Sequence, residues 1–383
     1  MKTYKKIRSV VAGVMFVFCV VSCAFPRYNK ISTQINKDGS GKRIVVAKTS
    51  HPFLAGDSTL NPFFFTVTPE WKVKCLECSD SAFMEKYKNL ELAGSEEFSI
   101  QAFRTFKNIG DCSASLQCDE NLSPLLKPLE SVKKQFRWFY TYYSFSARYA
   151  DVSNKLPVSP NQYMTKEEIK CWFQGDLSPY KGMAGWELKN ELDAIEKKYN
   201  LYFAQIIYES SWFAIDYVEQ KSSDTTYLFQ MNSVKDTLFS IYAKDMENDD
   251  IDKIEKLEPK IICKMLDNFL KTTHFSALYK ANEAEMDTIY KQKIDFIDLF
   301  LKELDYELIM PGKIIYANAP SNENDTLSWK IEAFQFLGDD HVLEAQSRSA
   351  NIWAFVVSFF FVILTLFCFV RLRKMRRMYR KIL

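Results

Sequence analysis

The chain has 383 residues, of which 47% are hydrophobic and 26% charged, enough apolar material for about two or three domains. Basic and acidic residues nearly balance, 50 against 48, and this balance excludes a broad electrostatic surface for nucleic acid. The balance conceals one asymmetry, because the last segment, 371–383, contains seven Lys or Arg and no acid.

The first segment of the chain has the pattern of an export signal. Four basic residues in 1–8 precede an apolar run over 10–21 that is too short for an ordinary membrane span. A signal peptide is therefore predicted over 1–22. The tetrapeptide at 20–23, Val-Val-Ser-Cys, is similar to the lipobox of bacterial lipoproteins, which implies lipidation of Cys23. The alternative is an ordinary signal peptide or an uncleaved anchor with an incidental cysteine.

The next segment, 23–155, is predicted to form the first part of a β-rich ectodomain. Two strand-like runs at 31–36 and 43–48 flank an Asp-Gly turn and predict a β-hairpin. Residues 98–106 predict a further strand.

Aromatic residues are densest over 136–149, which predicts one long strand that is largely covered on both faces. Trp138, Tyr140 and Tyr142 are the candidates for stacking on a sugar ring or lining a lipid pocket. The competing interpretation is that these side chains simply belong to a core, as aromatic side chains of strands commonly do.

Helical periodicity replaces strand alternation over 156–305. A Thr-x-x-Glu capping box begins at residue 165, and 186–219 carries a continuous apolar stripe without Gly or Pro. Alternation returns over 306–350. The order predicts an α+β fold, in which a β-rich, membrane-proximal domain is interrupted by a large α-helical insertion.

One transmembrane helix is predicted over 352–370, a stretch of 19 residues without charge that spans roughly 28 Å. The basic tail, 371–383, follows it directly. The positive-inside rule therefore predicts a cytoplasmic C-terminus and an ectodomain in the periplasm, anchored in a bacterial inner membrane.

Several short pieces together resemble the LppM-type membrane lipoproteins. They are the lipobox at 20–23, Met310-Pro311-Gly312, the strand with Trp329 and the segment at 345–347 before the span. The resemblance implies an envelope lipoprotein without established catalytic residues. It covers well under a fifth of the chain, and the large helical segment departs from such a compact domain.

Six cysteines fall in the predicted ectodomain, an even number that fits disulfides in an oxidising compartment. Structural disulfides or buried thiols, a metal site and a redox pair remain open for Cys75, Cys78, Cys112 and Cys118.

No catalytic or metal-binding motif is present in the sequence, and the three histidines are scattered. We therefore expect no cofactor and a non-enzymatic envelope lipoprotein that scaffolds or contacts other envelope components. Its expected partners are the bilayer and envelope proteins, without nucleic acid. The alternatives are a lipid- or glycan-binding module that uses the aromatic strand, and an extracytoplasmic thiol oxidoreductase or hydrolase.

Overall fold

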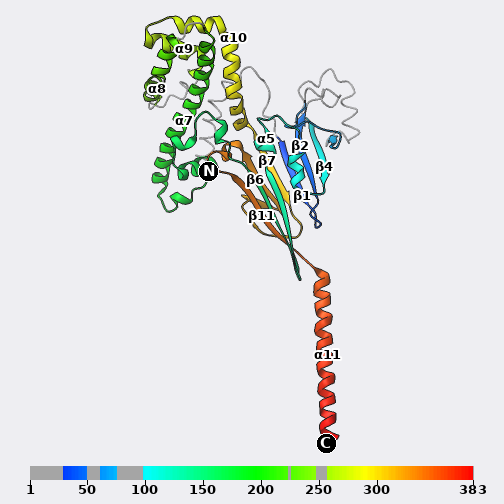
Figure 1. Ribbon diagram of the computed structural model, residues 1–383. Helices are drawn as coiled ribbons and strands as arrows, with labels where there is room; N and C mark the ends of the chain where they lie inside the picture. Colours follow the sequence, from blue (N-terminus) through cyan, green and yellow to red (C-terminus); the bar gives the residue numbers. More distant parts are fainter. Residues whose placement is uncertain (1–28, 50–60, 76–97, 223–225, 247–256, 383) are drawn as a thin grey trace.

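The computed structural model describes residues 29–49, 61–75, 98–222, 226–246 and 257–382. Two β-sheets lie between a helical region and a single long helix that points away from the rest of the molecule (Figure 1). The predicted α+β class is confirmed. The expected signal segment with Cys23, and also Cys78, lie outside the described residues.

The larger sheet has seven strands in the order β3-β4-β2-β1-β7-β10-β9. Strands β1 and β2 form the expected antiparallel hairpin. After the helical insertion the chain returns to this sheet as β7, which pairs with β1 in parallel. The bounds are β1 (Asn29–Ile35), β2 (Gly41–Thr49), β3 (Lys72–Cys75), β4 (Phe98–Phe106), β7 (Glu303–Ile309), β9 (Ser321–Glu323) and β10 (Thr326–Glu332).

The smaller sheet has the order β5-β6-β11-β8 and is antiparallel throughout. Its bounds are β5 (Leu129–Arg137), β6 (Tyr140–Tyr149), β8 (Lys313–Ala317) and β11 (His341–Ala350). The prediction of one long aromatic strand over 136–149 is wrong. The chain turns at Trp138-Phe139, so the stretch is the end of β5, a two-residue turn and β6. No Gly, Pro, Asn or Asp marks this turn in the sequence.

The two sheets pack face to face around alternate residues of their strands. Along β6, the inward side chains from Thr141 to Tyr149 are buried, and every second residue lies nearer the solvent. The rings of Phe145 in one sheet and Tyr306 in the other stack with centroids 6.2 Å apart. Short helices α4 (Gly110–Ala114) and α5 (Ser123–Leu126) connect the sheets between β4 and β5.

The helical insertion lies between β6 and β7 and is dominated by α7 (Gly185–Gln220), whose 36 residues extend roughly 54 Å. The helix predicted at 186–219 is thus confirmed. The predicted capping box forms at α6 (Lys166–Ile169), where Thr165 and Glu168 exchange hydrogen bonds. The α-helices that follow α7 in the described part of the insertion are α8 (Thr226–Met246), α9 (Pro259–Leu270) and α10 (His274–Ile294).

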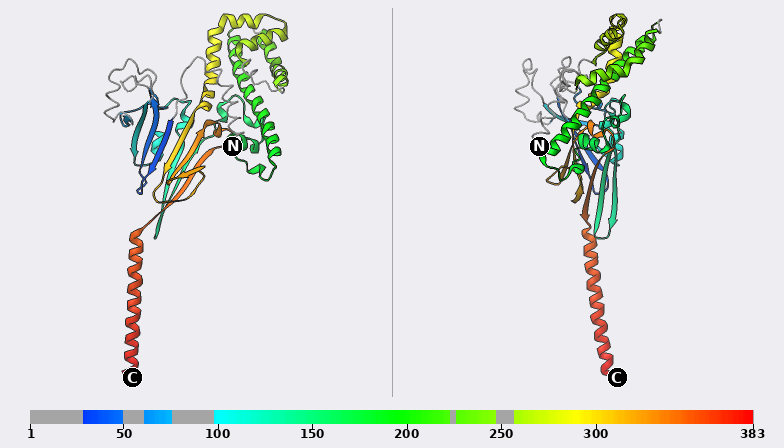
Figure 2. Two further views of the ribbon diagram at one scale, coloured as in Figure 1. Left: turned by 180° about the vertical axis from the view of Figure 1, so that it is seen from behind. Right: turned by 90° about the vertical axis from the view of Figure 1, so that its left-hand side faces the viewer.

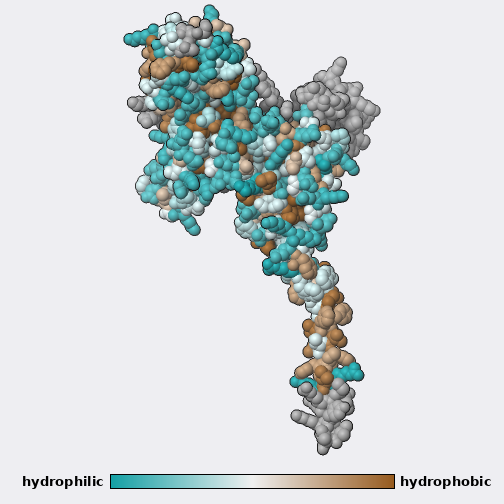
Figure 3. Space-filling view, viewed as in Figure 1, coloured by the Kyte–Doolittle hydropathy of each residue, from teal (hydrophilic) through white to brown (hydrophobic). Residues whose placement is uncertain are grey.

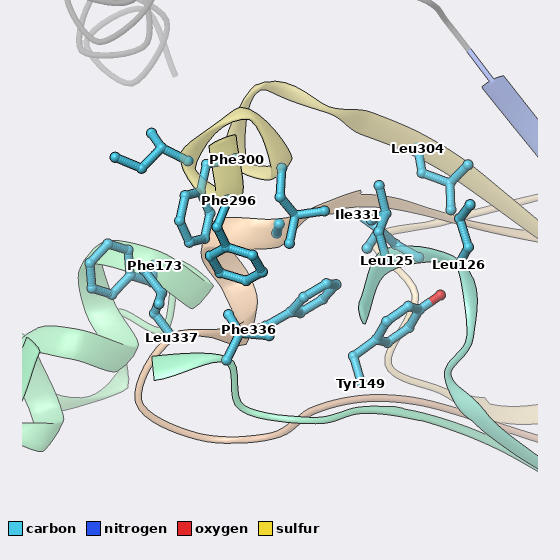
Figure 4. Close-up of a cluster of buried hydrophobic side chains, with 14 of the residues drawn as sticks. Leu125, Leu126, Tyr149, Phe173, Phe296, Phe300, Leu304, Ile331, Phe336 and Leu337 are labelled. Atoms are coloured by element: carbon cyan, nitrogen blue, oxygen red, sulfur yellow. The ribbon is translucent and has the colours of Figure 1, made fainter. Parts of the chain in front are cut away.

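A cluster of buried aromatic and aliphatic side chains joins the helical insertion to the sheets (Figure 4). Phe173, before α7, stacks on Phe334 with ring centroids 6.1 Å apart, and Phe300, after α10, lies 4.7 Å from the same ring. Phe336 then stacks on Tyr149 of β6 at 4.8 Å. This continuous packing makes the insertion and the sheets one body.

The last element, α11 (Ile352–Ile382), contains a 22-residue candidate span, Ile352–Arg373, whose most apolar window of 18 residues has mean hydropathy 2.7. Only 6% of the window is buried in the protein. It leaves the smaller sheet as an isolated rod at the end opposite the helical insertion (Figure 2). Its surface is largely hydrophobic, in contrast to the mixed surface of the rest (Figure 3). A helix of this length and exposure fits a single membrane span, called the span below.

Candidate membrane-interface site

The hairpin of β5 and β6 ends in a group of large aromatic residues that its own sheet does not cover. Phe136, Trp138 and Phe139 are 55%, 46% and 40% exposed. The nearby Tyr140 and Tyr142 are partly buried on the outer face of β6. This end of the hairpin, 136–142, is called the hairpin tip below.

The aromatic rings of the hairpin tip pack against the first turns of the span. The Phe136 ring lies parallel to the Trp353 indole with ring centroids 6.1 Å apart. The Trp138 ring meets the same indole edge-on at a centroid distance of 5.3 Å. Phe139 contacts Phe355 at a ring-centroid distance of 4.8 Å. The Trp138 indole N–H also donates a 2.8 Å hydrogen bond to the Ser358 hydroxyl.

Asn351, between β11 and α11, ties the hairpin tip to the start of the span. Its side-chain amide donates to the carbonyls of Arg137 and Trp138 at 3.1 and 3.0 Å. Its backbone N–H donates to the Phe139 carbonyl, and its side-chain oxygen accepts from the Thr141 hydroxyl at 2.9 Å. One residue thus satisfies the carbonyls of a turn that has no glycine.

The contact with Ser358 shows how far the hairpin tip extends beside the span. Ser358 is six residues beyond Ile352, which corresponds to roughly 9 Å along the helix axis. A 22-residue span is roughly 33 Å long and the hydrocarbon core is about 30 Å thick, so the hairpin tip lies where the span crosses the boundary between headgroups and hydrocarbon. Trp and Tyr favour this interfacial depth because their rings combine an apolar body with a polar group.

The three residues predicted for ligand stacking therefore come together at one place, and all three have protein partners there. Trp138 packs on Trp353, and Tyr140 lies 5.9 Å from Phe355. The Tyr142 ring lies 5.2 Å below the Arg137 guanidinium. Sequence reasoning missed Asn351, since no pattern marks a single asparagine between a strand and a span.

Comparison of the chain with known proteins assigns no family. No family model, no curated protein and no solved structure matches the chain. The site must therefore be interpreted from its own geometry.

The cysteines of the described region do not assemble into a reactive site. Cys75 ends strand β3 and is disulfide-bonded. Cys112 is a buried free thiol and Cys118 a half-buried one. Burial raises the pKa of Cys112 to about 12, which keeps the thiol protonated and unreactive. Among the described residues, no group of three metal-ligating side chains is present.

A second polar assembly, the inter-sheet cluster of Thr33, Arg43, Ser113, Glu130 and Tyr306, lies between the sheets. The Arg43 guanidinium, 1% exposed, pairs with the fully buried Glu130 carboxylate at 2.5 Å. Ser113 and Tyr306 donate to the same carboxylate at 2.6 and 2.8 Å. Arg43 also donates to the Thr33 and Ser113 hydroxyls at 3.0 and 2.7 Å.

The inter-sheet cluster is closed and hydrogen-bonded on all sides. Burial together with the Glu130 charge raises the pKa of the Tyr306 phenol well above its usual value, so Tyr306 stays a donor. The arrangement connects β1, β2 and β7 of one sheet with β5 of the other. We assign it a structural role, since buried charges that are paired and fully hydrogen-bonded hold neighbouring elements in one arrangement.

Proposed function

We propose that this chain is a non-enzymatic, membrane-anchored envelope lipoprotein whose helical insertion contacts other envelope components. The observation that carries the proposal is the attachment of the hairpin tip to the span. Besides the covalent connection, two kinds of contact hold the sheets to α11. Asn351 donates hydrogen bonds to the hairpin tip, and the aromatic rings of the hairpin tip pack on Trp353 and Phe355. A domain held in this way keeps its orientation on the bilayer and presents its far end, the helical insertion, to partners (Figure 2).

The helical insertion offers aromatic side chains to such partners. Trp186 at the start of α7 is 67% exposed, and Phe229 on α8 is 80% exposed. Aromatic residues are enriched among the few positions that supply most of the binding energy of protein interfaces. Their exposure on the helical insertion supports a contact surface there.

The proposal includes export by the N-terminal signal, lipidation at Cys23 and a periplasmic ectodomain. The basic residues after the span support this orientation, because Lys and Arg near the end of a span favour the cytoplasmic side. A span anchors far more strongly than one acyl chain, so the anchor that matters is α11.

Two alternatives receive less support from the geometry. A thiol oxidoreductase needs a reactive thiolate, usually at the start of a helix, whereas Cys75 ends an edge strand and Cys112 is buried. A glycan platform needs free ring faces, whereas Trp138 and Tyr140 lie against the span.

Site-specific photo-cross-linking in intact cells tests the proposal. A photoreactive amino acid in place of Phe229 or Trp186 is expected to give a reproducible cross-link to one protein. The matched control carries the same amino acid in place of Glu323, an exposed residue of strand β9. Identical, non-specific products from all three positions, or none from the helices, would contradict the proposed contact surface.

A further inference from the structure

The outer face of the smaller sheet is basic near the span. Residues directly opposite one another on neighbouring strands point to the same side of a sheet, so the register defines which side chains share this face. Three successive rows, counted away from the span, are Arg137-Tyr140-Ala350, Gln135-Tyr142-Arg348-Lys313 and Lys133-Ser144-Gln346-Tyr316. These rows contain four cations and no carboxylate, and they are called the basic-aromatic face below.

The two arginines of the basic-aromatic face lie over its tyrosine rings. The Arg137 guanidinium is 5.2 Å from the centroid of Tyr142, and the Arg348 guanidinium is 5.0 Å from that of Tyr140. Cation–π contacts hold these guanidinium groups at the surface while leaving most of their N–H donors free to bind.

The cations of this face differ from others of the same molecule in having no acidic partner. Arg148, farther along the outer face of β6, pairs with Asp340, and Lys30 pairs with Glu307. Across the described ranges, no ion pair engages Lys133, Arg137, Lys313 or Arg348, and all four are exposed. The positive charge of this face is therefore uncompensated by the protein.

The basic-aromatic face begins where the span begins. Tyr140 contacts Phe355 in the first turn of α11, and Arg348 precedes Ile352 by only four residues. The guanidinium groups consequently lie at the depth of the phosphates of the outer leaflet once the span is inserted. Arginine forks match phosphate oxygens, and each cation near an anionic bilayer contributes about 1 kcal/mol, roughly a fivefold change in binding.

We propose that the basic-aromatic face is a binding site for anionic phospholipid headgroups of the membrane in which α11 is embedded. Arg137 and Arg348 bind the phosphate, Lys313 and Lys133 add positive charge, and the rings of Tyr140 and Tyr142 hold the two guanidinium groups in place. The site rests on the membrane anchoring of the proposed function but not on any protein partner.

The full chain in nanodiscs of mixed phosphatidylcholine and phosphatidylglycerol tests the site by native mass spectrometry. The measured quantity is the ratio of phosphatidylglycerol to phosphatidylcholine that remains bound to the protein after the protein is released from the nanodisc. The variant R137Q/K313Q/R348Q is compared with K260Q/K264Q/K280Q, which removes the same charge from exposed lysines of α9 and α10. Both variants keep the basic tail, so lipid bound by the tail contributes equally to the two measured ratios.

We expect the triple variant at the sheet to lower the ratio at least about tenfold and the helical control to leave it unchanged. R137K/R348K, which keeps the charge and the fold, should retain most of the enrichment. Equal ratios in the two triple variants would overturn the site. Failure of the wild-type chain to insert into nanodiscs would overturn both the site and the anchoring, whereas a missing cross-link from Phe229 would affect only the proposed partner contact.

Discussion

The two ends of the β5–β6 hairpin serve opposite purposes. At the base, Glu130 and Tyr149 are buried within the molecule, and Glu130 joins the inter-sheet cluster. At the tip, Trp138 and Arg137 are exposed beside the span. The same pair of strands thus stabilises the sandwich at one end and meets the membrane at the other. Substitutions at the base should change folding, and substitutions at the tip should change orientation and lipid contact.

The largest effect is expected for Arg43 at the base. Arg43→Met leaves the Glu130 carboxylate buried without its ion-pair partner, and this should lower the free energy of unfolding by about 3–5 kcal/mol. Urea unfolding of the chain in detergent, followed by tryptophan fluorescence, measures the loss. The double variant R43M/E130L should lose clearly less than R43M alone, because it buries no unpaired charge. Equal losses for the two variants would show that Arg43 acts by packing and not by charge pairing.

The next effect is expected near the tip, at Gly312 between β7 and β8. Gly312 has a φ of +84°, and an added Cβ would lie 2.2 Å from the Arg348 carbonyl oxygen. Gly312→Ala should therefore push β8 away from β11 and cost about 2–3 kcal/mol in the same unfolding experiment. Gly182→Ala is the matched control, since Gly182 has a φ of +97° but open space around it. A similar loss in both variants would assign the cost to backbone conformation alone.

The base of the hairpin should also respond to pH through His341, which pairs with Tyr149 across β11 and β6. Burial lowers the pKa of His341 to about 4 from 6.5, so the unfolded chain takes up a proton between these values and the folded chain does not. The contribution of neutral His341 to the free energy of unfolding is therefore complete above pH 6.5. It falls by about 2–3 kcal/mol as the pH is lowered toward 4. His341→Phe, measured beside the wild type from pH 7 to 4, should show a shallower decline. Parallel curves would mean that other groups cause the decline.

The smallest effect on stability is expected at the tip, for Asn351→Ala. Loss of its hydrogen bonds to the turn should cost only about 1 kcal/mol, because the exposed carbonyls can bind water instead. The orientation of the sandwich should change more. The distance distribution between spin labels at Cys368 in the span and at Q346C on β11 should broaden in Asn351→Ala and stay narrow in the conservative Trp138→Phe. An unchanged distribution in Asn351→Ala would show that the rings alone hold the tip.

The sequence predicted the elements whose residue pattern is periodic and missed those that depend on distant partners. The apolar stripe of 186–219 and the uncharged run at 352–370 were sufficient to place α7 and the span, because each pattern is local. The turn at Trp138-Phe139 could not be predicted, since Asn351, more than 200 residues away, satisfies its carbonyls. The burial of Arg43 depends likewise on Glu130, 87 positions along the chain.

The direct passage from β11 into α11, with Asn351 alone between them, has a mechanical consequence. β11 is paired on both sides, with β6 and with β8, and it runs along the line that leads into the span. A pull on the helical insertion against the anchored helix therefore loads these strands in shear, so that many ladder hydrogen bonds must break together. Tension applied to the helical insertion would therefore reach the span directly through the paired strands, because no flexible linker between β11 and α11 has to extend first.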